Sequence, residues 1–299
     1  MIIKRFIGLF VTLTLITMSS YSMDMIKYRA SFNTTKAFCF TTINEMRVLN
    51  NLMTSTGTVA AGYDITPILE NGENELSIKV ASLTVPQDLS LEPDATCEFT
   101  VIAYTDENEY KLVSVEGTAD DNGNPTGKTT PVYQGNSMVG FVSEGTVKNS
   151  VLYEVKRTFV AKGLPEWAWV SSTPFNDTHQ NIQKLKDRYL DLWMMLSNKD
   201  VAALGRESEV AMREKGSTQG YSADEFWQSF EFDKDFANGF TALSIDWRGF
   251  KFVSYRDGRL FRLEDDDGRS PLQIWKEGEG SISYNPYFSL INGKLAITR

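Results

Sequence analysis

The sequence predicts a mixed fold, an antiparallel β-sandwich followed by an α+β domain with helices packed on an antiparallel sheet. Short β-rich runs separated by turn clusters recur from Lys27 to about Val160, a spacing typical of a sandwich. Beyond them the hydrophobic period becomes helical and then alternates again, which is the order of an α+β plan. We therefore expect a sandwich domain over residues 23–161, a linker over 162–175 and an α+β domain over 176–299.

The first 22 residues have the pattern of a secretory signal peptide. Lys4 and Arg5 supply the positive start, and Phe6 to Thr17 form the apolar run. That run is too short to cross a membrane, which takes roughly 20 apolar residues. Ser20 and Ser22 are the small residues expected before the cut. We therefore expect cleavage after residue 22 and a periplasmic or secreted protein, with no membrane span in the mature chain.

The composition excludes several classes of protein. With 41% hydrophobic and 12% aromatic residues, the chain is too apolar to be disordered. Its net charge of −9 argues against a nucleic-acid partner, because neutralising phosphates needs clustered Lys and Arg. The single histidine, His179, excludes multi-histidine metal sites, and its polar surroundings indicate a surface position. We expect no metal, no cofactor and no catalytic residue.

The two cysteines, Cys39 and Cys97, lie in strand-like segments. In an oxidising compartment such an isolated pair is expected to form a disulfide. Closing a loop of this length would stabilise the fold by about 4 kcal/mol in the chain-entropy description. The alternative is two buried free thiols on separate strands, because the sequence does not give the separation of the two Cα atoms.

One segment of the N-terminal half carries a more specific pattern. Asp64 and Thr66 are placed to cap a single helical turn, Gly72 tolerates the positive φ needed to turn back, and an alternating strand follows over Glu75–Val80. This order of Asp-Ile-Thr, a spacer and Gly-x-Asn before an alternating strand resembles the jelly-roll (galactose-binding-like) sandwich domain of the family-two glycoside hydrolases. The match covers residues 43–82. It implies a jelly-roll fold and a carbohydrate link without a reaction, because no catalytic barrel fits in the chain.

The expected linker carries Trp167 and Trp169. Two tryptophans spaced by two residues lie on one face of an extended strand, where they could stack on a sugar ring. The alternative is that the pair fills the core or the seam between the two domains. The sequence leaves both interpretations open.

The C-terminal half begins with helices and continues as strands. Hydrophobic spacings of three and four, together with capping residues, predict three helices: from Asn176 or Asp177 to Ser197, from Asp200 to Gly216, and from the capping box of Ser222 and Glu225. Alternating segments then predict strands at Leu243–Trp247, Phe250–Tyr255, Leu260–Leu263, Leu272–Trp275, Ser283–Leu290 and Lys294–Ile297.

A basic island lies at one of the predicted hairpins. The Asp257-Gly258 pair predicts a tight turn that places Arg256 opposite Arg259. Like charges directly opposite each other are unfavourable unless an anion neutralises them. The candidate binding residues of this region are Arg248, Arg256, Arg259 and Arg262. Either local carboxylates such as those of 264–267 satisfy them, or they recognise an acidic ligand or partner surface.

Together these features favour an exported, non-catalytic binding protein. The leading hypothesis is a protein-binding role, as a periplasmic inhibitor or immunity-type protein whose negative charge would speed encounter with a basic partner. The alternative is a carbohydrate-binding module protein that uses the paired tryptophans. A second alternative is an exported hydrolase that needs only two carboxylates.

Overall fold

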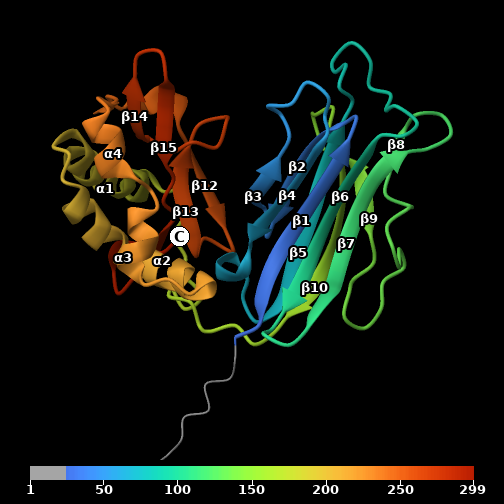
Figure 1. Ribbon diagram of the computed structural model, residues 1–299, viewed down its shortest axis with the longest axis horizontal. Helices are drawn as coiled ribbons and strands as arrows, with labels where there is room; N and C mark the ends of the chain where they lie inside the picture. Colours follow the sequence, from blue (N-terminus) through green and yellow to red (C-terminus); the bar gives the residue numbers. More distant parts are fainter. Residues whose placement is uncertain (1–24) are drawn as a thin grey trace, which may run out of the picture.

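We describe the protein from a computed structural model, which places residues 25–299; the expected signal peptide lies outside these residues. The fold is predominantly antiparallel β-sheet, with helices in the C-terminal half (Figure 1). No helix among residues 25–299 is long and apolar enough to span a membrane. Figure 1 shows two lobes side by side, a β-lobe over residues 25–161 and a helix-containing lobe over 176–299, with the segment 162–175 running between them.

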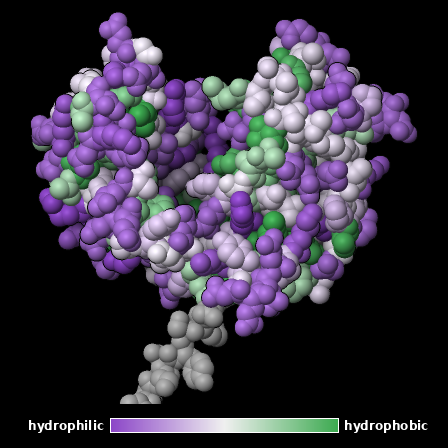
Figure 2. All heavy atoms as spheres, viewed as in Figure 1, coloured by the Kyte–Doolittle hydropathy of each residue, from purple (hydrophilic) through white to green (hydrophobic). Residues whose placement is uncertain are grey.

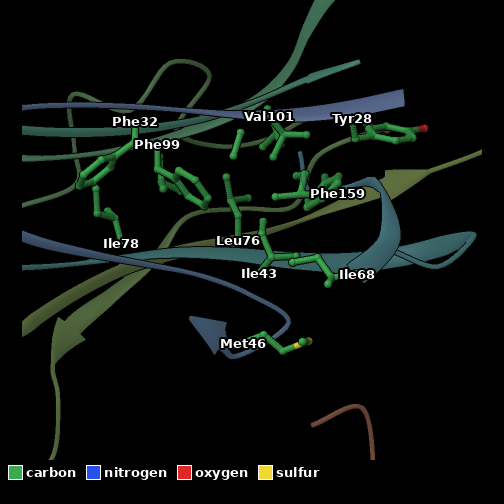
Figure 3. Close-up of a cluster of buried hydrophobic side chains, with 14 of the residues drawn as sticks. Tyr28, Phe32, Ile43, Met46, Ile68, Leu76, Ile78, Phe99, Val101 and Phe159 are labelled. Atoms are coloured by element: carbon green, nitrogen blue, oxygen red, sulfur yellow. The ribbon is translucent and has the colours of Figure 1, made fainter. Parts of the chain in front are cut away.

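The β-lobe consists of two five-stranded sheets. Its strands are β1 (Lys27–Thr35), β2 (Phe38–Ile43), β3 (Met46–Asn50), β4 (Val59–Asp64), β5 (Gly72–Ala81), β6 (Thr96–Tyr104), β7 (Glu109–Ala119), β8 (Pro125–Thr126), β9 (Ser143–Thr146) and β10 (Tyr153–Ala161), with a 3-10 turn η1 (Thr66–Ile68). One sheet has the order β4-β1-β6-β7-β8 and the other the order β3-β2-β5-β10-β9. Figure 3 shows Phe32, Phe99 and Val101 of the first sheet facing Leu76 and Ile78 of the second within one buried cluster.

A disulfide links the two sheets of the β-lobe. Cys39 on β2 and Cys97 on β6 are bonded, with their Cα atoms 6.0 Å apart, so the disulfide expected from the sequence is confirmed. Both residues are fully buried. The bond therefore ties two strands that belong to different sheets and that no backbone hydrogen bond joins.

The capped turn before β5 forms where the sequence places it. The Asp64 side chain accepts a hydrogen bond from the backbone N–H of Thr66 at 3.0 Å, and Ile65 and Leu69 on either side of the turn are completely buried. Asn74 closes the segment by accepting from the backbone of residue 70 and donating to its carbonyl. These side-chain contacts fix the path of the chain over η1, which becomes part of the seam between the lobes.

The second lobe contains the α-helices of the described chain. Its elements are α1 (His179–Ser197), α2 (Val201–Gln219), α3 (Ala223–Gln228), α4 (Phe232–Ala237), β11 (Thr241–Ala242), η2 (Trp247–Gly249), β12 (Lys251–Tyr255), β13 (Leu260–Glu264), β14 (Leu272–Lys276), β15 (Gly280–Tyr284), β16 (Phe288–Ile291) and β17 (Lys294–Ile297). The strands form sheets of order β11-β14-β15 and β12-β13-β16-β17. Helix α1 packs on the larger sheet, since Leu185 and Tyr189 share a buried cluster with Phe261 and Phe288.

Two helix boundaries differ from the sequence prediction. The N-cap of α1 is Thr178, whose side chain accepts from the backbone of Asn181, instead of one of the two residues before it. Helix α2 runs past Gly216 to a left-handed C-cap at Gly220. Gly216 serves another purpose, because a Cβ there would lie 2.8 Å from the carbonyl oxygen of Tyr221. Glycine is required at position 216 because the chain after the helix passes close to it, and not because the helix ends there.

Two of the predicted strands are also corrected. The segment 243–247 is irregular and leads into η2, with the short strand β11 lying just before it. The segment 283–290 holds two strands, since β15 ends at Tyr284 and β16 begins at Phe288. Pro286 lies between them and has no N–H to donate to a sheet ladder. Helix α4 was not predicted.

Candidate binding cleft

A carboxylate of the β-lobe neutralises the paired arginines of the β12–β13 turn. Glu70 accepts from both terminal nitrogens of Arg259 at 2.8 Å each and forms an ion pair with Arg256. Arg256 also donates to the Asn44 side chain at 3.0 Å. The acidic segment 264–267, the expected local source of neutralising charge, does not pair with either arginine. The two arginines therefore join the lobes and are not free to bind a ligand.

The two tryptophans of the segment 162–175 lie inside the same seam. Trp167 and Trp169 are 2% and 0% exposed, and their indole N–H groups donate to the carbonyls of Leu69 and Pro67 at 2.9 and 3.2 Å. The Arg299 guanidinium lies 5.1 and 5.7 Å from the two ring centroids, a cation–π arrangement. Neither ring presents a face to solvent, so the pair fills the seam and offers no platform for a sugar.

The remaining two candidate arginines are also paired, at separate places. Arg248 is exposed and holds Asp246 at 2.6 Å, which lowers the pKa of that carboxyl to about 2 through the side-chain hydrogen bond. Arg262 is buried and donates to Glu264 at 2.7 Å and to the Gly268 carbonyl at 3.0 Å. The structure thus does not bring the six expected binding residues together into one site.

A cleft of 1260 Å³ opens between the lobes, next to the seam. Figure 2 shows it as the hollow that separates the two halves of the molecule. Strands β2 and β3 and the loop after them line one side, and α2, α3 and the end of β15 line the other. Leu52 and Met53 of that loop stand at the rim, 48% and 97% exposed. The docking of the two lobes therefore creates the cleft.

The cleft is basic although the protein is acidic. Seven of its lining residues are basic and three are acidic, a local balance of +4, whereas the whole chain carries −9. The basic residues are Arg29, Arg47, Lys79, Lys215, Arg262, Arg269 and Arg299, and the acidic ones are Asp64, Asp266 and Asp267. A concave surface lined by one sign of charge concentrates ligands of the opposite sign.

Lys215 of α2 stands out among these groups. Burial lowers its pKa from 10.5 to about 8, and the nearby positive charges of Arg299 and Arg262 add to the effect. Each of these two arginines has its own carboxylate, at 2.5 Å in Glu214 and at 2.7 Å in Glu264. Within residues 25–299, no carboxylate forms an ion pair with the Lys215 ammonium.

Sequence reasoning missed Lys215, although one signal pointed to it. The buried residues of α2 include Leu204, Ser208, Ala211 and Met212, and Lys215 follows the last two of them at helical spacings of four and three. A lysine that continues the buried stripe of an amphipathic helix is out of place on a simple core face. Its helical position therefore indicated partial burial, whereas its two arginine neighbours are distant in sequence, Arg262 on β13 and Arg299 just after β17.

The fold and the cleft define a β-rich, two-lobed protein with a basic groove between its lobes. The chain matches no protein-family model, no curated protein and no solved structure among those with which it was compared. Among residues 25–299, no three His, Cys, Asp or Glu side chains are grouped so as to hold a metal ion.

Proposed function

We propose that this chain is an exported, non-catalytic binding protein that captures a protein partner, as a periplasmic inhibitor or immunity-type protein does, and that the cleft receives a segment of that partner. The observation that carries the proposal is a basic cleft of 1260 Å³ built by both lobes of an acidic protein. When the charges of a partner complement those of the cleft and of the surface around it, they speed encounter and disfavour wrong partners.

Two features support export. The N-terminal residues have the order of charged start, apolar run and small residues that typifies a signal peptide. The Cys39–Cys97 disulfide is of a kind that persists in oxidising compartments. We further propose that the two sheets of the β-lobe are a jelly-roll-like sandwich domain over 23–161, followed by an α+β domain over 176–299.

The dimensions and rim of the cleft favour a protein segment over a small molecule. Small-molecule sites are typically about 300–1000 Å³ and enclosed, whereas this cleft is larger and opens between the lobes. Exposed apolar side chains at Leu52 and Met53 resemble the contact residues of protein interfaces. The carbohydrate hypothesis loses its stacking surface, because Trp167 and Trp169 are buried in the seam.

The proposal is tested by affinity capture that must depend on the cleft. The mature protein would be incubated at low salt with periplasmic and secreted extract from its native source, and captured proteins identified by mass spectrometry. A rim variant carrying Leu52→Glu and Met53→Glu would be compared with a control carrying Leu89→Glu and Met138→Glu. The control residues are 53% and 39% exposed and lie outside the cleft.

We expect one stoichiometric protein that the wild type and the control capture and that the rim variant loses. Its capture should weaken as salt rises, because charge steers the encounter. Equal capture by the rim variant would overturn the role of the cleft. Recovery of glycan without any protein would overturn the protein-binding proposal and favour a carbohydrate partner.

A further inference from the structure

We propose that the Lys215 ammonium in the cleft anchors a carboxylate carried by the bound partner segment, either an acidic side chain or a chain end, with Arg262 and Arg299 beside it. This inference rests on the proposed function and names the chemical group that the cleft recognises. It is carried by the placement of three cations around one part of the cleft that has carboxylates for only two of them.

The balance of charge at this place is uneven. Arg262 is paired with Glu264, and Arg299 with Glu214. Lys215 is close enough to both arginines for their charges to disfavour its own protonation. An anion bound at Lys215 would supply the third negative charge and remove that repulsion, whereas a neutral group would leave it in place. The arrangement therefore selects an anionic group of the ligand.

Arg299 adds a second, independent observation. Its side chain is 1% exposed, and burial lowers the pKa of its guanidinium to about 10. Two of its nitrogens bind Pro67, Glu214 and the adjacent backbone, but Nη2 is buried without a hydrogen-bond acceptor. A buried donor without an acceptor is unfavourable. Arg299 and Lys215 line the same cleft, so the charge of this incompletely satisfied guanidinium favours an anion bound there.

The surrounding groups fit a carboxylate better than a metal-bound or cationic ligand. Burial raises the pKa of Tyr287 above its ordinary value, so its phenol stays protonated and can donate. Asp64, the acidic residue at the end of β4 that lines the cleft, already accepts from Thr66 and Thr218. Donors thus outnumber free acceptors around Lys215, as in sites that hold oxyanions through charge-assisted hydrogen bonds.

The test follows Lys215 directly, by nuclear magnetic resonance of the mature protein with its lysines dimethylated by a ¹³C label. Lys215→Met identifies the Lys215 signal by its loss. Lys184→Met, at an exposed lysine of α1 that lies outside the cleft, is the matched control. The probes are N-acetyl-L-glutamate α-methylamide, which carries one carboxylate, the neutral N-acetyl-L-glutamine α-methylamide and the sugar acid D-glucuronate, each titrated at pH 7 and pH 9.

We expect N-acetyl-L-glutamate α-methylamide to shift the Lys215 signal and raise its apparent pKa, and N-acetyl-L-glutamine α-methylamide to leave it unchanged. Affinity should fall at least threefold from pH 7 to pH 9, because Lys215 loses its proton there while Arg262 and Arg299 keep their positive charges. Lys215→Met should lose at least tenfold in affinity and Lys184→Met none. If the neutral probe bound as tightly as the glutamate probe, or if Lys215→Met bound the glutamate probe as tightly as the wild type, the inference would be overturned. Tighter binding of D-glucuronate than of the glutamate probe would show that the carboxylate comes from a sugar acid and not from a peptide.

The outcome is separable from that of the proposed function. A partner captured through the rim residues whose binding is unaffected by Lys215→Met would sustain the proposed function and overturn the anchor. Carboxylate binding at Lys215 without any captured partner would sustain the anion site and contradict the protein-binding role.

Discussion

The ion pairs of Glu70 explain how the lobes are held together, and Glu70→Gln tests that explanation. The carboxylate, 17% exposed, serves Arg256 and Arg259, which are 15% and 19% exposed. Removing one charged member of a buried pair costs about 3–5 kcal/mol, because the other charge stays buried without its partner. Residual solvent contact and the hydrogen bonds that glutamine retains reduce this cost, so we expect a loss of about 2–3 kcal/mol in the free energy of unfolding.

The measurement is urea unfolding followed by tryptophan fluorescence, since Trp167 and Trp169 lie in the seam. Glu70→Gln should lower the midpoint, with the seam tryptophans becoming exposed first. The matched control is Glu75→Gln, which removes a carboxylate from β5 that pairs with Lys156 at 3.3 Å with both side chains about one-third exposed. Such pairs contribute less than about 1 kcal/mol. Equal losses in the two variants would refute the idea that Glu70 holds the lobes together.

Three further predictions concern the rest of the molecule. Replacing Cys39 and Cys97 together by alanine opens a loop of 58 residues and should lower the free energy of unfolding by about 4 kcal/mol; an unchanged calorimetric transition would contradict this. The stability of the wild type should rise from about pH 8 to pH 9, because the unfolded chain binds the Lys215 proton more tightly than the folded chain there. Lys215→Met should abolish that rise and stabilise the protein at pH 7 by about 1–2 kcal/mol, as urea unfolding at several pH values would show; a rise that persists in the variant would exclude Lys215 as its source. Arg157→Met removes a 3% exposed guanidinium that donates to the carbonyls of Pro131, Val132 and Gly140 within the segment 131–142 and of Ser114 on β7. Limited proteolysis should then cleave that segment at least tenfold faster, and unchanged cleavage would show that Arg157 does not hold it in place.

Much of the secondary structure followed from the sequence, because its causes are local. The Ser222 capping box of α3 forms as predicted, and the β12–β13 hairpin has the predicted register, with Phe252 opposite Leu263. Turn residues, caps and the hydrophobic period act over a few positions along the chain. The boundary errors at α1 and α2 arose where several neighbouring residues were competent caps and packing chose among them.

The sequence by itself determined that this is an acidic chain, β-rich in its N-terminal half, with helices followed by strands in its C-terminal half and one expected disulfide, since composition and short-range pattern carry that information. Only the tertiary structure decided that Arg259 pairs with Glu70, 189 residues away, that the two seam tryptophans are buried, and that Lys215 lies beside Arg262 and Arg299. The physical reason is that charge pairing and desolvation depend on which surfaces meet when the lobes dock. The same docking brings basic side chains of both lobes, some paired with carboxylates and some not, around one cleft.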